Sequence, residues 1–164
     1  MVRCRLGFFH TLSFKDIPGT KLLVFAKKTS AFLKLTGVIN VIFTGDRRMR
    51  SLNRKFLGRD AVTDVIAFDP GFPPFGGISE VYINLAQARR SAKMLGHTVF
   101  MELAVLVSHG FLHLSGMTDG RKKSREQMLE KGVWLIRKFL PAGVRSHPLG
   151  RAKPARQGVG CDLK

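Results

Sequence analysis

Ser108-His109-Gly110-Phe111-Leu112-His113-Leu114-Ser115-Gly116-Met117-Thr118-Asp119-Gly120 closes an apolar segment and sets two histidines four residues apart, just before a glycine-bounded turn that carries a carboxylate. On a helix, side chains at positions i and i+4 lie on one face with Cβ atoms roughly 6 Å apart, so two imidazoles there can share one metal ion. A turn at Gly116 can fold Asp119 back toward the pair. Two histidines, one carboxylate and one open position are the composition of a catalytic zinc site rather than a closed structural one.

The spacing of the histidines leaves a second interpretation open. Two histidines four residues apart on an apolar helix can also be ordinary core or surface residues. Their setting favours a metal, because His109 and His113 end a segment that is apolar on every side, a glycine follows each within three residues, and a carboxylate is within reach. The residues alone therefore keep both a metal site and a structural pair open.

Length and composition indicate one domain with tails. With 164 residues, 45% of them hydrophobic, the chain is long enough for one domain with a real core and too short for two. Cys4 and Cys161 lie near opposite ends and lack metal-ligand spacing, so we expect free thiols in a reducing compartment. No apolar run approaches the roughly 18 residues of a membrane span.

Charge is the most unusual bulk property of the chain. Its 28 Lys and Arg residues oppose 11 Asp and Glu residues, which gives a formal net charge of +17. A field of that size and sign favours a polyanionic partner, and nucleic acid is the commonest one. An anionic membrane surface is the lesser alternative, and a purely solubilising role would fit a smaller imbalance better.

The N-terminal segment, residues 1–15, is basic and free of acidic residues. This composition is typical of an organellar transit peptide and is equally compatible with a first β-strand. We accordingly expect a cytoplasmic protein if the source is bacterial, and a mitochondrial or plastid protein if it is eukaryotic. Residues 21–35 place their lysines on one face of an amphipathic helix, which Gly37 ends.

The next segments alternate between strand and helix patterns. Residues 38–43 are predicted to form a buried strand, and residues 46–56 a helix with Asp46 as its candidate N-cap. That helix has one apolar stripe and one strongly basic face. The basic residues are Arg47, Arg48, Arg50, Arg54 and Lys55.

The remaining elements follow from the same patterns. Two further strands are predicted at 63–68 and 78–84, separated by a Pro- and Gly-rich loop at 70–77. Helices are predicted at 85–95, 98–114 and 122–140, with Pro141 stopping the last one. We expect residues 16–140 to form the single domain and residues 141–164 to be a basic, disordered tail that touches a polyanion.

At residues 108–120 the sequence resembles a known family, the YbeY-type endoribonucleases, which are also described as ribosomal RNA maturation factors. The family motif is His-Gly-x-Leu-His-Leu-x-Gly-x-x-His, and residues 109–119 match six of its seven specified positions. The likeness covers roughly residues 38–138. Further segments that resemble the family are Leu52-Asn53, Thr63-Asp64-Val65-Ile66-Ala67-Phe68, Glu80-Val81-Tyr82-Ile83 and the helical Met128.

This resemblance implies a fold and a cofactor. The fold is an α/β (α+β) domain in which helices flank a small mixed sheet, with the metal site at the end of the central buried helix. One Zn²⁺ ion is held by three side chains. Carried over position by position, its ligands are His109, His113 and Asp119.

Two departures from the family pattern bear on activity. The third ligand is usually histidine, and Asp119 replaces it; aspartate is a competent zinc ligand but adds a negative charge that should make bound water less acidic. The family also often carries an arginine after an aromatic residue before the Thr-Asp strand, where Leu57 follows Phe56. That change can remove a cation that stabilises the phosphate in the transition state. Arg59 is the candidate substitute.

As an enzyme of this family, the chain is expected to be a zinc-dependent hydrolase that cuts single-stranded RNA during ribosomal RNA maturation and small-subunit assembly. The basic residues of 46–56 would hold the RNA backbone through sequence-independent contacts, and a solvated helix face is their plain alternative. Glu80 is a candidate general base or a carboxylate that supports the ligands, although a lone acid in a strand is more often structural.

The rival interpretation is a catalytically impaired factor that kept the fold for binding RNA or the ribosome. The altered third ligand, the missing arginine and the charge of +17 all fit it. Expected partners are RNA, above all ribosomal RNA, and the small ribosomal subunit or its assembly factors. DNA is not expected, because no helix has the pattern of a DNA-reading element.

Overall fold

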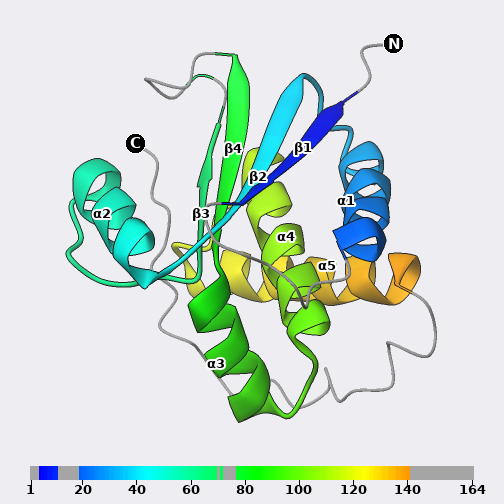
Figure 1. Cartoon of the computed structure of the whole chain (residues 1–164). Coiled ribbons are helices and arrows are strands. Elements are labelled where there is room, and N and C mark those ends of the chain that lie inside the picture. Colours follow the sequence, from blue (N-terminus) through cyan, green and yellow to red (C-terminus); the bar gives the residue numbers. More distant parts are fainter. Residues whose placement is uncertain (1–3, 11–18, 70, 72–76, 141–164) are drawn as a thin grey trace.

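In the computed structural model of this chain, residues 4–10, 19–69, 71 and 77–140 are described. The expected tail at 141–164, most of the loop at 70–77 and residues 11–15 of the N-terminal segment lie outside them. Helices and strands alternate along most of the described chain (Figure 1). In order they are β1 (Arg5–His10), α1 (Gly19–Phe32), β2 (Val38–Thr44), α2 (Asp46–Leu57), β3 (Val65–Phe68), β4 (Ile78–Asn84), α3 (Leu85–Leu95), α4 (Val99–Leu114) and α5 (Lys122–Phe139).

The strands form one mixed sheet in the order β1-β2-β4-β3. The first two pairings are parallel, with Arg5 opposite Val38 and Val38 opposite Ile78. β3 runs antiparallel to β4 and forms an edge of the sheet. The expected small mixed sheet flanked by helices is confirmed. Residues 5–10 of the basic N-terminal segment form a strand of this sheet, which agrees with the strand interpretation of that segment.

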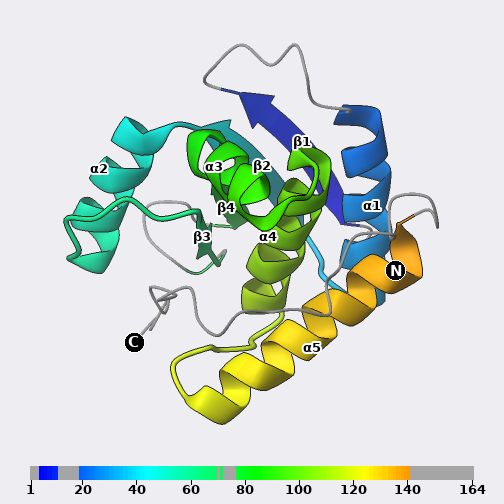
Figure 2. The ribbon, with the colours of Figure 1, turned by 90° about the horizontal axis from the view of Figure 1, so that it is seen from below.

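The two faces of the sheet are covered by different helices. Side chains alternate along a strand, so neighbouring residues point to opposite faces. Val81 and Ile83 belong to the large core that α1 and α4 build, whereas Tyr82 belongs to a smaller core beneath α2. Figure 2 shows α2 apart from the other helices, with α5 crossing α4 and α1.

α4 is the central helix of the large core. Ten of its residues are buried, as the apolar segment predicted. Its N-terminus is capped by Thr98, whose side chain accepts a hydrogen bond from the Met101 amide at 3.2 Å. Close contact with the sheet depends on Gly110, because a Cβ there would lie 2.5 Å from Cγ1 of Val81. Any larger residue would push the helix away from β4.

Some element ends differ from the sequence prediction. The strand predicted at 63–68 begins only at Val65, because Asn84 binds the carbonyl oxygens of Thr63 and Asp64. Asp46 is not the N-cap of α2. Gly45 takes that position, and the Asp46 carboxylate binds other partners.

Within the described residues, no single helix is both long and apolar enough to cross a membrane. α3 and α4 together have the length and composition, but the pair is bent by 118°.

Candidate metal centre

His109, His113 and Asp119 come together at the C-terminal end of α4, as the sequence predicted. One ligand atom from each residue lies within 4.8 Å of the other two. The two Nε2 atoms are 3.1 Å apart, and Oδ2 of Asp119 is 3.7 Å from that of His109 and 4.0 Å from that of His113. The imidazole rings meet edge to face at an angle of 89°. All three donor atoms therefore converge on one point.

The turn after α4 brings Asp119 back to the histidines. The Gly116 amide donates to the His113 carbonyl at 2.9 Å, and the Met117 amide donates to the Leu112 carbonyl at 3.0 Å. These bonds form a Schellman motif, which satisfies the last carbonyls of the helix and needs a left-handed residue. Gly116 supplies that conformation with φ +88°.

Asp119 is the most deeply buried residue of the cluster. It is 4% exposed, and its Oδ1 has no hydrogen-bond partner among the described residues. From α5, Nε of Arg125 donates a hydrogen bond to the Asp119 backbone carbonyl at 3.2 Å. A buried carboxylate without hydrogen bonds is unfavourable unless another charge or donor satisfies it.

The histidines differ in exposure, and this difference affects protonation. The side chain of His113 is 8% exposed and that of His109 is 35% exposed. Burial lowers the pKa of His113 below its ordinary value, and the nearby Asp119 carboxylate and a hydrogen bond that the imidazole donates to the Met117 backbone oppose that shift in part. A neutral imidazole is the form that binds metal. The His109 side chain is partly exposed to solvent, so the cluster is accessible from the side of His109.

The donor set fits a zinc ion. In a tetrahedral site with bonds of about 2.0–2.1 Å, ligand atoms lie about 3.3–3.4 Å apart. The observed separations of 3.1, 3.7 and 4.0 Å bracket that value. A bound cation would also offset the charge of the buried Asp119 carboxylate, whose Oδ1 has no hydrogen-bond partner among the described residues. Three side-chain ligands leave one position open, which is the arrangement of catalytic sites.

Glu80 is not brought to this cluster. Its neighbour Val81 faces α4, so Glu80 points to the opposite face of the sheet, beneath α2. There its Oε2 accepts a hydrogen bond from the Tyr82 hydroxyl at 2.7 Å. Burial, together with this bond and the charge of Glu80, raises the pKa of Tyr82 to about 12. The structure thus gives Glu80 a structural contact and does not support its predicted catalytic role.

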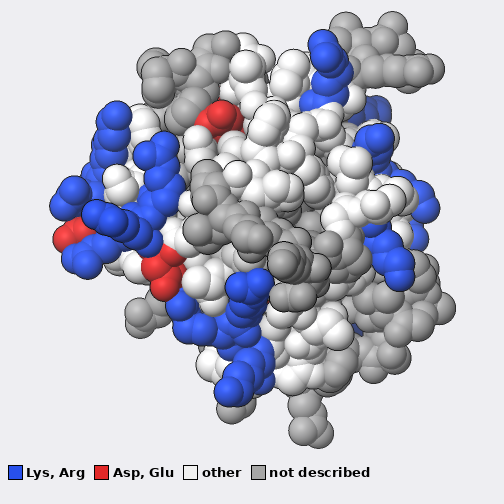
Figure 3. Space-filling model, in the orientation of Figure 1, with Lys and Arg blue, Asp and Glu red and all other residues white. Residues whose placement is uncertain are grey.

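The basic face of α2, made of Arg47, Arg48, Arg50, Arg54 and Lys55, also lies on that opposite side. All five residues are exposed. Figure 3 shows Lys and Arg side chains gathered over α2. Arg50 makes a bidentate ion pair with Asp60 at 2.7 and 2.9 Å. An open cavity of about 610 Å³ is lined by Asp46, Arg47, Arg50, Ser51, Arg54, Asp60 and Val62.

The C-terminal end of α2 holds Leu57, where the sequence lacks the expected arginine, and Arg59, the candidate substitute, follows the helix. Leu57 packs at the edge of the small core beneath α2. Arg59 is exposed just beyond the helix, and its amide donates to the Asn53 carbonyl at 3.2 Å. Its predicted catalytic role stays a prediction.

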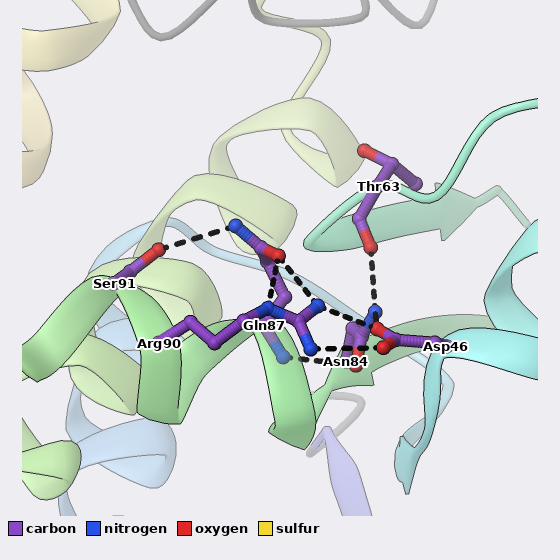
Figure 4. Close-up of polar contacts among 6 residues, drawn as sticks. All are labelled: Asp46, Thr63, Asn84, Gln87, Arg90 and Ser91. Carbon is purple, nitrogen blue, oxygen red and sulfur yellow. Dashed lines mark hydrogen bonds and ion pairs between the residues drawn. The ribbon is translucent and has the colours of Figure 1, made fainter.

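A polar network that the sequence did not predict fixes α2 against α3 (Figure 4). Asn84 ends β4, and its Nδ2 donates to Oδ1 of Asp46 at 2.7 Å and to the Thr63 carbonyl at 3.1 Å. Arg90 from α3 binds both Asp46 oxygens at 2.7 and 2.8 Å. The Arg90 hydrogen bonds lower the pKa of Asp46, with burial opposing and Asn84 assisting. Asn84 is the residue that joins the sheet to both helices.

The fold and the cluster define an α/β protein with a candidate metal centre at a helix end. The model of the family described as Endoribonuclease YbeY matches residues 17–139. The chain therefore belongs to the YbeY family. This membership confirms the predicted family and the predicted enzyme class, a nuclease.

Relatives named Endoribonuclease YbeY are similar over most of the domain. The protein of Solibacter usitatus is 38% identical over 105 residues, which are 64% of this chain and 69% of that one. The protein of Elusimicrobium minutum is 34% identical over 112 residues, 66% of this chain and 78% of that one. The protein of Thermus thermophilus is 43% identical over 94 residues, 54% of this chain and 66% of that one.

A solved structure is similar in fold. The solution structure of TM1509 from Thermotoga maritima superposes with a TM-score of 0.54 and 24% sequence identity. The match covers 92% of this chain and 99% of that one. At this identity the likeness supports the architecture alone.

Proposed function

We propose that this protein is a zinc-dependent endoribonuclease that cuts single-stranded RNA in ribosomal RNA maturation and assembly of the small ribosomal subunit. The observation that carries the proposal is the convergence of His109, His113 and Asp119 within 4.8 Å at an open helix end. The relatives that share this domain are named endoribonucleases. The net charge of +17 suits a polyanionic substrate.

Each of the three side chains would contribute a different kind of ligand to the ion. His113 is buried, and burial lowers the pKa of its imidazole, which favours the neutral form that binds metal. Asp119 offers a carboxylate oxygen from a buried position. When bound, zinc would supply a Lewis acid that offsets the negative charge on phosphate oxygens. The exposed side of His109 is where a phosphodiester can approach.

The basic face of α2 is proposed to bind RNA at a distance from the reacting bond. Because the sheet separates it from the cluster, these cations act on flanking phosphates rather than on the phosphate that is cut. Such contacts are sequence-independent and weaken as salt rises.

A second candidate is a binding factor that has lost cleavage. Two observations favour it: Asp119 stands where the family usually has histidine, and Leu57 is an uncharged residue packed at the edge of a core. On this alternative, the fold binds RNA or the ribosome with or without metal.

One preparation can separate these candidates. The purified protein and the variant His113→Ala are assayed for bound zinc and for cleavage of single-stranded RNA, with His10→Ala as a control outside the cluster. The enzyme proposal expects one zinc per chain and cleavage that His113→Ala abolishes while His10→Ala retains it. Tight RNA binding with cleavage that is indifferent to His113→Ala would overturn the proposal.

A further inference from the structure

Arg125 is a basic residue of α5 that contacts Asp119, one of the three residues of the candidate metal centre. It lies in the first turn of α5, and its Nε donates to the Asp119 carbonyl at 3.2 Å. Asp119 is also the residue whose carboxylate completes the cluster. One residue therefore links the guanidinium of Arg125 to a candidate metal ligand.

Most of this guanidinium is available for another partner. The hydrogen bond to Asp119 uses only Nε, and in the part of the chain that the structure describes no acceptor contacts the two Nη nitrogens. The residue is exposed. A guanidinium presents its donors in a planar fork that binds two oxygens of one phosphate at once. The hydrogen bond from Nε ties this guanidinium to the backbone of Asp119, a residue of the cluster.

The positive charges around Arg125 do not stabilise helix α5. The residues beside Arg125 at the start of α5 include Arg121, Lys122 and Lys123, and the first turn has no acid. Cations at a helix N-terminus oppose the helix dipole and destabilise the helix, whereas an anion bound there reverses the effect. A phosphate held by Arg125 would benefit from all of these charges.

The arginine-rich face of α2 does not lie at the His109–His113–Asp119 cluster. The basic face of α2 lies across the sheet from the cluster, because α2 packs against the smaller core that contains Tyr82, whereas α4 packs against Val81 on the other face. A phosphate at the cluster therefore needs a cation from the α4 and α5 side.

We infer that Arg125 binds the phosphate group of the RNA that is positioned at the His109–His113–Asp119 cluster. This inference rests on the proposed function for its substrate. The fork donates hydrogen bonds to two non-bridging phosphate oxygens, and the contact strengthens as negative charge grows on them in the transition state. The competing role is purely structural: Arg125 only holds Asp119 in place.

The test compares Arg125→Gln and Arg125→Lys with Arg137→Gln, which removes an exposed arginine from the far end of the same helix. Each variant is measured for zinc affinity, thermal unfolding, and kcat and KM on single-stranded RNA. We expect Arg125→Gln to retain zinc and to lower kcat/KM roughly 10- to 100-fold, with most of the loss in kcat. Arg125→Lys should recover part of the loss, and Arg137→Gln should resemble the unaltered protein.

A binding measurement keeps the inference separate from the proposed function. If the unaltered protein cuts no RNA, the function fails, yet binding of a short single-stranded 2′-O-methyl RNA to zinc-loaded protein still tests the contact. Arg125→Gln should then reduce the slope of log affinity against log salt by about 0.7, the value for one phosphate on a single strand. Loss of zinc in Arg125→Gln would overturn the inference and assign a structural role. Equal effects of Arg125→Gln and Arg137→Gln in both assays would overturn it as well.

Discussion

Replacing Asp119 with asparagine should change stability in opposite directions with and without metal. The substitution removes the charge and preserves the shape of the side chain. Asp119 is 4% exposed, its Oδ1 has no partner among the described residues, and its Oδ2 lies 3.7 Å or more from both histidine nitrogens. In the metal-free protein this carboxylate is thus desolvated without hydrogen bonds.

The size of each effect follows from that environment. A buried polar group without a hydrogen-bond partner costs about 1–3 kcal/mol of folding free energy. An asparagine amide removes only the cost of burying the charge, so Asp119→Asn should stabilise the metal-free protein by about 1 kcal/mol. With zinc the order reverses, because a carboxylate is the better ligand. A 100-fold loss of zinc affinity removes about 2.7 kcal/mol of binding-linked stability.

Urea unfolding of both proteins, followed by the fluorescence of Trp134, the only tryptophan, measures these differences. One series contains EDTA and the other saturating zinc, both at a pH well above the ordinary histidine value of about 6.5. Glu126→Gln on the exposed face of α5 controls for a general effect of removing an acid from this basic chain. If Asp119→Asn lowers stability in EDTA, the carboxylate is a structural anchor and the reasoning fails.

Three further predictions follow from the packing and charges. Gly110→Ala should destabilise the fold by roughly 1–3 kcal/mol in denaturant unfolding, since the added Cβ would meet Val81 at 2.5 Å; unchanged stability would show that α4 can move freely. Glu80→Gln should leave zinc binding and cleavage intact, and should lower the pKa of Tyr82, the single tyrosine, below about 12 in an absorbance titration. Because that raised pKa favours the neutral phenol in the folded state, its contribution to stability is complete below about 10 and is lost as pH rises through about 12. Neutralising the basic face of α2 should weaken RNA binding and flatten its salt dependence without changing zinc affinity; a loss of zinc would contradict the separation of the two sites.

Local patterns were sufficient to predict most helices and the convergence of His109, His113 and Asp119. The apolar run before His109 predicted a helix at 98–114, and α4 spans Val99–Leu114, because a segment that is apolar on every side is stable as a helix buried in the core. The i and i+4 spacing placed both imidazoles on one face. Gly116 correctly indicated the turn that returns Asp119, since a left-handed residue is needed there.

Features that depend on distant residues could not be predicted in this way. Asp46 looked like a helix cap, but Arg90, 44 residues later, and Asn84 bind its carboxylate instead. Strand alternation put Glu80 and Val81 on opposite faces, yet only the packing of α4 shows which face carries the metal cluster. Arg125 could not be singled out from the sequence, because its contact with Asp119 requires the turn between α4 and α5 to be known.

The central claim is that metal held by His109, His113 and Asp119 is required for RNA cleavage. The direct measurement strips the purified protein of metal, restores zinc in steps, and records the cleavage rate of single-stranded RNA against bound zinc. The account predicts no cleavage without metal and a linear recovery that ends at one zinc per chain. Cleavage that is undiminished in the metal-free protein would contradict it.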